Sequence, residues 1–134
     1  SDIGNTYIEV DLSEQHMYFY RDGKNIFESD FVSGNMSYDD RKTPTGVCHI
    51  AYKTKDFTLR GEKKEDGTYE YEEPVKYWMP FNGGVGFHDA PWRSEFGGDI
   101  YLTSGSHGCI NMPASSAAQL YDLIDESIPI VVFY

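Results

Sequence analysis

The sequence is poor in basic side chains and lacks long apolar runs. Eleven Lys and Arg residues stand against 22 Asp and Glu residues, which gives a formal net charge of -11. A domain with this charge repels phosphate backbones and anionic lipid surfaces, so nucleic-acid binding is not expected. No apolar run approaches the roughly 20 residues that cross a bilayer, and the first residues lack the basic and apolar regions of a signal peptide.

Cysteine is also scarce, and the two cysteines stand in different sequence contexts. Cys48 lies inside an apparent strand and is interpreted as a small buried apolar residue. Cys109 lies among polar residues and glycine. One possible cysteine pair is too little to indicate a redox compartment, so the cysteine count does not decide localisation.

Length and composition favour one β-rich domain. A chain of 134 residues, 40% of them hydrophobic, suits a single packed core, so residues 1–134 are expected to form one domain. Eleven Tyr, eight Phe and 13 Gly residues favour strands and tight turns, so we expect a mostly β (β-rich α+β) fold. Because the chain starts with Ser almost at a strand, we expect a processed domain whose anchor and other domains lie outside it.

The apolar pattern predicts the order of the elements. Strands are expected over 7–32 (a meander with a turn at 22–25), 47–51, 78–81, 85–87 and 128–134. Residues 53–74 carry many charges and few aliphatic side chains, which indicates an exposed flap hairpin. One helix is expected after Pro113, where apolar residues recur at helical spacing up to Ile124.

The chemical groups gather in residues 106–111, which read Ser-His-Gly-Cys-Ile-Asn. A thiol becomes a good nucleophile when a histidine or an electropositive backbone lowers its pKa. His107 shares a face with Cys109 on an extended chain, whereas His88 reaches Cys109 only if its strand lies alongside, so spacing leaves both histidines open. Gly108 allows its own N–H and that of Cys109 to converge on an oxyanion. This pattern suits acyl transfer.

Two segments together form a recognisable signature. They are Gly86-Phe87-His88-Asp89-Ala90-Pro91-Trp92 and, after a spacer, Ser106-His107-Gly108-Cys109-Ile110-Asn111. They resemble the catalytic domain of L,D-transpeptidases of the YkuD type, whose signature is a histidine, a spacer of this length, Ser or Thr, His-Gly-Cys, an apolar residue and Asn. The segment Thr43-Pro44-Thr45-Gly46 and the helix and strand after the cysteine also agree with that family.

The resemblance implies a YkuD-like β-sandwich and a role for each matched residue. It makes Cys109 the nucleophile and His88 the general base, with the N–H groups of Gly108 and Cys109 as the oxyanion hole. His107 and Asp89 support the catalytic pair, and the family orients its base through the backbone carbonyl of the residue that Asp89 occupies. Ser106, Asn111 and Trp92 are implied to support the loop or to contact substrate.

The implied activity is that of a peptidoglycan L,D-transpeptidase. Cys109 attacks the bond between a diamino acid and the terminal D-Ala of a tetrapeptide stem, D-Ala leaves, and an amine resolves the thioester to a 3→3 cross-link. Water would give an L,D-carboxypeptidase product, and the sequence does not choose between the two acceptors. The implied partners are stem peptides and carbapenem β-lactams, with no cofactor or metal, and the implied location is extracytoplasmic, at the cell wall.

Two readings from other classes compete with this one. His88, His107 and Cys109 are chemically suited to ligate zinc, but the paired spacing of common zinc motifs is missing. A cell-wall-binding domain that has lost turnover is the second, and the presence of both Cys109 and His88 argues against it.

Overall fold

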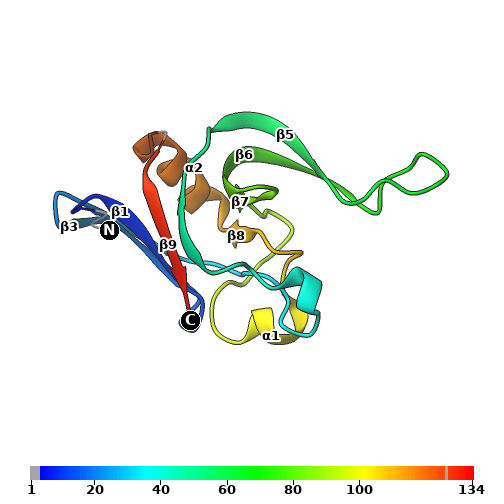
Figure 1. Ribbon diagram of the computed structural model, residues 1–134, viewed down its shortest axis with the longest axis horizontal. Coiled ribbons are helices and arrows are strands. Elements are labelled where there is room, and N and C mark those ends of the chain that lie inside the picture. The colour runs from blue at the N-terminus through cyan, green and yellow to red at the C-terminus, as the bar shows by residue number, and fades with distance from the viewer. Residues whose placement is uncertain (1–3, 126) are drawn as a thin grey trace.

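The structure, a computed structural model, describes residues 4–125 and 127–134 and contains two β-sheets with short helices (Figure 1). The first sheet has the order β3-β2-β1-β9-β4, with β1 Tyr7–Asp11, β2 His16–Arg21, β3 Lys24–Asp30, β4 Gly46–His49 and β9 Pro129–Phe133. The second has the order β5-β6-β7-β8, with β5 Thr54–Arg60, β6 Glu72–Asn82, β7 Val85–Asp89 and β8 Ile110–Met112. The helices are η1 Asp39–Arg41, α1 Ile100–Ser104 and α2 Ala114–Leu123.

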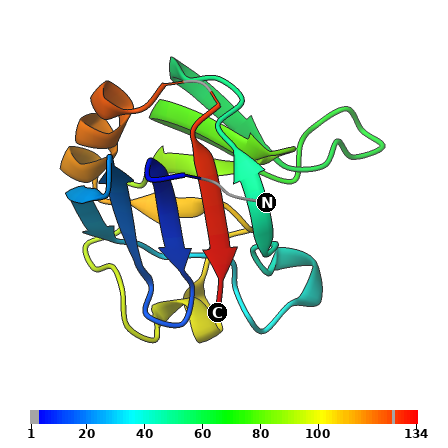
Figure 2. The ribbon, with the colours of Figure 1, turned by 60° about the vertical axis from the view of Figure 1, so that its left-hand side comes forward.

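The first sheet follows from the alternation of apolar and polar residues. Ile8 and Val10 of β1 are fully buried, while their neighbours along the strand are partly exposed, as expected for a strand with one face on the core. β1 pairs antiparallel with β2 and parallel with β9, so the C-terminal strand lies beside the N-terminal one (Figure 2). The predicted meander and closing strand are confirmed.

The core lies between the two sheets. Phe19 of the first sheet, Met79 and Phe87 of the second and Leu120 of α2 are all fully buried in one cluster. Burying a side chain of this size contributes about 1.5–3 kcal/mol, so this shared cluster holds the sheets together. The expected mostly β sandwich is confirmed.

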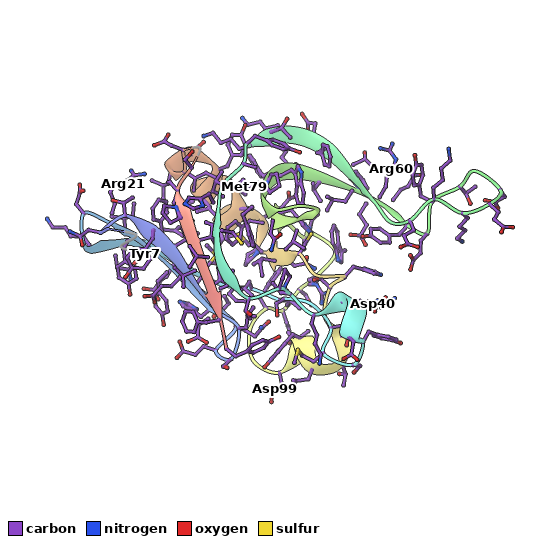
Figure 3. The ribbon with its side chains drawn as sticks, viewed as in Figure 1. Tyr7, Arg21, Asp40, Arg60, Met79 and Asp99 are labelled. Carbon is purple, nitrogen blue, oxygen red and sulfur yellow. The ribbon has the colours of Figure 1, made fainter. Side chains whose placement is uncertain are left out.

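The β5–β6 hairpin, called the flap below, projects from the sandwich (Figure 1). Its pairing runs from Thr54 opposite Trp78 to Arg60 opposite Glu72, and residues 62–70 beyond it are exposed. Arg60, labelled on the flap in Figure 3, forms a 2.8 Å ion pair with Glu72. The predicted flap hairpin is confirmed.

The helices agree with the sequence in part. α2 lies where a helix was expected, but Pro113 precedes it as the N-cap, and Ile124 follows it as the C-cap. The five-residue α1 was not predicted, because one turn of Ile100–Ser104 is too short to show helical periodicity. No helix in the described ranges is long and apolar enough to cross a membrane.

Candidate active site

Parallel pairing of β7 with β8 brings the two sequence motifs together. His88 lies opposite Asn111, and Cys109 comes directly before β8. Side chains two residues apart on an extended chain point to the same face, so this register places Cys109 on the side of the sheet that His88 occupies. Both residues line one cavity of about 230 Å³.

The cavity collects most of the predicted site residues. Those that line it are His88, Trp92, Ser106, His107, Cys109 and Asn111. The two others, Asp89 and Gly108, do not line it; both are buried and form hydrogen bonds with their neighbours. The spacing of the motifs thus predicted a real cluster.

His88 is held in one tautomer. Its side chain is 2% exposed, and its Nδ1 lies 2.7 Å from the carbonyl oxygen of Asp89. A carbonyl only accepts, so Nδ1 must carry the proton and Nε2 of the neutral ring is the acceptor. Burial lowers the pKa of His88, partly offset by Asp89. The ring is therefore neutral near pH 7 and suited to take a proton.

Cys109 is protonated at rest. Burial raises the pKa of its thiol to about 11; the charge of Glu73 adds to the rise and a backbone hydrogen bond with Gly86 opposes it. The Sγ donates to the carbonyl oxygen of Gly84 at 3.4 Å, a contact that suits a thiol and would repel a thiolate. The apolar surroundings of the thiol come from the flap itself, because Cys109 packs against a small cluster of the flap residues Leu59, Val75 and Trp78.

The loop before Cys109 is held by two hydroxyl groups. Ser106 Oγ donates to the Cys109 carbonyl at 2.6 Å and accepts from the Gly108 N–H at 3.0 Å. Thr43 Oγ1 donates to the Gly108 carbonyl at 2.7 Å and accepts from the Gly34 N–H at 2.9 Å. Gly108 has φ +131°, which other residues rarely adopt. The first residue of the Thr-Pro-Thr-Gly segment therefore anchors the loop that precedes Cys109.

The Asp89 side chain faces away from the imidazole. Its carboxylate accepts backbone N–H groups of Lys76 and Tyr77, each at 2.9 Å, with a further 3.2 Å contact to Lys76. It is 4% exposed. The side chain thus ties β6 to the end of β7, while the backbone carbonyl orients His88.

His107 and Trp92 lie at the exposed edge of the cavity. The His107 ring stacks on Tyr71 of the flap, with centroids 4.4 Å apart. Trp92 is 48% exposed and lies 5.9 Å from the His88 ring. His107 therefore contacts the flap from the loop, and Trp92 offers an exposed aromatic face beside His88.

The flap aromatics divide into two groups. Tyr71 and Trp78 face the site, Trp78 at 6.1 Å from the His88 ring, whereas Tyr77 packs against Tyr121 of α2. Tyr77 therefore packs on α2 instead of facing the cavity.

Sequence reasoning missed Glu73, Arg93 and Gly84, which also line the cavity. Glu73 ends a locally acidic run of the flap that reads as solvated surface. Arg93 follows Trp92 directly, and its position one residue beyond the motif was the available signal. Gly84 contacts Cys109 through its backbone carbonyl oxygen, and no sequence pattern marks such a contact.

The two cysteines are free thiols: Cys48 lies in β4 of the first sheet, and Cys109 comes directly before β8 of the second. Cys48 of β4 packs against the main core, as expected for an apolar role, but it is half-buried, whereas the sequence predicted a buried residue. Within residues 4–125 and 127–134, no group of three or more His, Cys, Asp or Glu side chains is arranged to hold a metal ion.

A cysteine and a neutral histidine of fixed tautomer, sharing one cavity, are the reacting pair of cysteine acyltransferases. Residues 5–132 match the YkuD family, the L,D-transpeptidase catalytic domain. The chain therefore belongs to the L,D-transpeptidase (YkuD) catalytic domain family.

Solved structures of an Enterococcus faecium L,D-transpeptidase are similar in sequence and fold. A crystal structure of a cysteine-to-serine mutant is 47% identical, with a TM-score of 0.85 over 96% of this chain and 50% of that chain. The catalytic domain acylated by ertapenem, solved by NMR, is also 47% identical, with a TM-score of 0.81 over 99% of this chain and 100% of that one.

A more distant relative is the Bacillus subtilis (strain 168) protein YciB, whose name assigns it provisionally to the L,D-transpeptidases. It is 24% identical over 135 residues, which cover 96% of this chain and 66% of the relative. The chain thus spans about half of the E. faecium crystal chain and 66% of YciB.

Proposed function

We propose that this chain is the catalytic domain of a peptidoglycan L,D-transpeptidase, with Cys109 as nucleophile and His88 as general base. The observation that carries the assignment is the 2.7 Å hydrogen bond from His88 Nδ1 to the Asp89 carbonyl, in a residue that shares its cavity with the thiol. It leaves Nε2 as the proton acceptor. His107 is exposed and stacked on Tyr71, which suits a supporting role.

The reaction starts from a neutral pair, because burial disfavours both the thiolate and the imidazolium. His88 Nε2 takes the thiol proton as Cys109 Sγ bonds to the carbonyl carbon that joins the diamino acid to D-Ala. The carbon–nitrogen bond then breaks, and the imidazolium returns the proton to the leaving amine of D-Ala. A thioester on Cys109 and a neutral His88 remain.

An acceptor resolves the thioester in the second half of the reaction. The side-chain amine of another stem attacks the thioester carbonyl and loses a proton to His88, and the thiol leaves and recovers that proton. The product is a 3→3 cross-link. Water in place of the amine gives the L,D-carboxypeptidase product, which we propose as a side activity.

The proposed oxyanion hole is built from the N–H groups of Gly108 and Cys109. Because the Gly108 N–H donates to Ser106 Oγ at 3.0 Å, it must exchange that acceptor for the oxyanion during the reaction. The Ser106 hydroxyl also donates to the Cys109 carbonyl, so this exchange need not release the loop. Trp92 and Asn111, both at the cavity, are proposed to contact the stem peptide.

The proposed inhibitors are carbapenem β-lactams. The 47% identical E. faecium catalytic domain is acylated by ertapenem, and a lactam carbonyl presents the same reacting group to Cys109 as the peptide does. Since stem peptides are cross-linked outside the cytoplasmic membrane, we place the domain there, at the cell wall. Residues 1–134 are proposed to act as one domain within a longer protein.

The test compares two cysteine variants on a tetrapeptide stem. We expect Cys109→Ala to abolish D-Ala release, measured by mass spectrometry, while Cys48→Ala retains it and both variants keep the wild-type circular dichroism spectrum. Equal loss of activity in the two variants would remove Cys109 from its role.

The choice of base is tested by the rate of Cys109 acylation by ertapenem, followed by intact-mass spectrometry. His88→Ala is expected to suppress acylation, because the proton acceptor is lost. His107→Gln, the matched control, is expected to keep most of the wild-type rate. Suppressed acylation in His107→Gln alone would exchange the two roles.

A further inference from the structure

Arg93 lies in the turn after β7 and lines the cavity that holds Cys109 and His88. Its Nη1 donates to the carbonyl oxygen of Ser104, at the end of α1, at 3.0 Å. Its Nε is buried and, among the residues that the structure describes, has no hydrogen-bond partner. One edge of the guanidinium is therefore fixed to the wall while another donor stays unused.

A guanidinium carries five N–H donors in a planar fork, which matches the two oxygens of a carboxylate. Burial lowers the pKa of Arg93 and the charge of Glu73 raises it, and arginine stays protonated at neutral pH. A buried cationic donor without an acceptor is costly, so this side chain favours an anionic ligand in the cavity.

The inference rests on the function proposed above, because that reaction places an anion beside the thiol. The leaving residue of a tetrapeptide stem is its C-terminal one, which carries the free carboxylate. One residue spans at most about 3.8 Å, so the carboxylate lies roughly that far from the carbonyl carbon that Cys109 attacks. It must therefore enter the same cavity, where a carboxylate without a partner would be strongly disfavoured.

Two arginines line the cavity, and only one is suited to this anion. Arg60 stands on the flap (Figure 3), where its Nε is already paired with Glu72 at 2.8 Å and its guanidinium lies over Tyr69. Among the described residues, the hydrogen-bond partner of the Arg93 side chain is a backbone carbonyl, and no carboxylate is paired with it by a hydrogen bond. We propose that Arg93 binds the terminal carboxylate of the stem peptide and so selects donors that end at the residue to be released.

The experiment uses two donors that differ only at the C-terminus: a tetrapeptide stem with a free carboxylate and the same stem as its carboxamide. The kcat/KM for release of the C-terminal residue is measured by mass spectrometry for wild type, Arg93→Gln, Arg93→Lys and Arg60→Gln. Wild type is expected to prefer the acid by about 10- to 100-fold, the range of a charge-assisted hydrogen bond.

The ratio of kcat/KM for the acid donor to that for the amide donor is expected to differ among the variants. Arg93→Gln should bring the acid to within about threefold of the amide, by slowing the acid and leaving the amide nearly unchanged. Arg93→Lys should keep part of the preference, since lysine retains the charge without the fork. Arg60→Gln, the charge-matched control, should keep the wild-type ratio.

An acid-to-amide ratio near one in the wild-type protein would overturn the inference. So would a ratio in Arg93→Gln that equals the wild-type one. If circular dichroism shows that Arg93→Gln does not fold, Arg93→Lys takes its place. An acid-to-amide ratio in Arg93→Lys equal to that of wild type would exclude bidentate binding of the carboxylate. Failure of the proposed function looks different: wild type would then release the C-terminal residue from neither donor.

Discussion

The protonation state of Cys109 leads to a quantitative prediction for its reactivity. With a thiol pKa of about 11, roughly one molecule in ten thousand is a thiolate at pH 7 and roughly one in a hundred at pH 9. Because iodoacetamide reacts with the thiolate, we expect the alkylation rate to rise about tenfold per pH unit from pH 7 to pH 9. A preformed thiolate–imidazolium pair would instead react at a nearly constant rate over that range.

The perturbation that isolates the cause is Glu73→Gln, made in a Cys48→Ala background so that Cys109 is the thiol that reacts. Glu73 raises the pKa of Cys109 through its negative charge, after the larger effect of burial. The neutral glutamine side chain should therefore lower the pKa of Cys109 and speed its alkylation at every pH below 9. The alkylation rate should still rise steeply with pH, because burial continues to raise the pKa. Exposed Glu70→Gln serves as the control.

The assay is intact-mass spectrometry of the alkylated protein over time, at fixed ionic strength. A wild-type rate that changes less than about twofold between pH 7 and pH 9 would refute a buried neutral thiol. A Glu73→Gln profile identical to wild type would leave burial as the cause and remove Glu73 from the explanation.

Three further predictions concern stability and the flap. Asp89→Ala leaves two backbone N–H groups of β6 without their buried acceptor and should cost about 3 kcal/mol in urea unfolding, whereas Asp89→Asn, which retains one oxygen, should cost less. Tyr71→Ala removes the ring stacked on His107, so amide exchange in the flap should speed up while the core stays protected. Partial burial lowers the pKa of His16, but hydrogen bonds to its two acidic partners outweigh that effect and raise the pKa. The stabilisation of the fold by these bonds is therefore complete below pH 6.5 and declines as the pH rises through the raised pKa. His16→Gln should thus destabilise the protein more at pH 5.5 than at pH 8.

Local signals in the sequence predicted the strands well. Alternation in β1 and the Asn-Gly-Gly turn before β7 depend on neighbouring residues, so they can be read directly from the chain. The short α1 and the exact start of α2 were not predictable, because one helical turn and a cap depend on what packs around them. The flap was recognised by its charges, but its contacts with the site were not.

The sequence by itself determined the family and the pair of motifs, because these depend on residue types and their spacing. Tertiary structure placed His88 in the same cavity as Cys109, since 21 positions of chain separate the two residues and the parallel pairing of β7 with β8 aligns their segments. It also decided that the thiol rests protonated. That state arises from burial against the flap residues and from the charge of Glu73. Glu73 lies far from Cys109 in the sequence, so only the fold brings its charge close to the thiol.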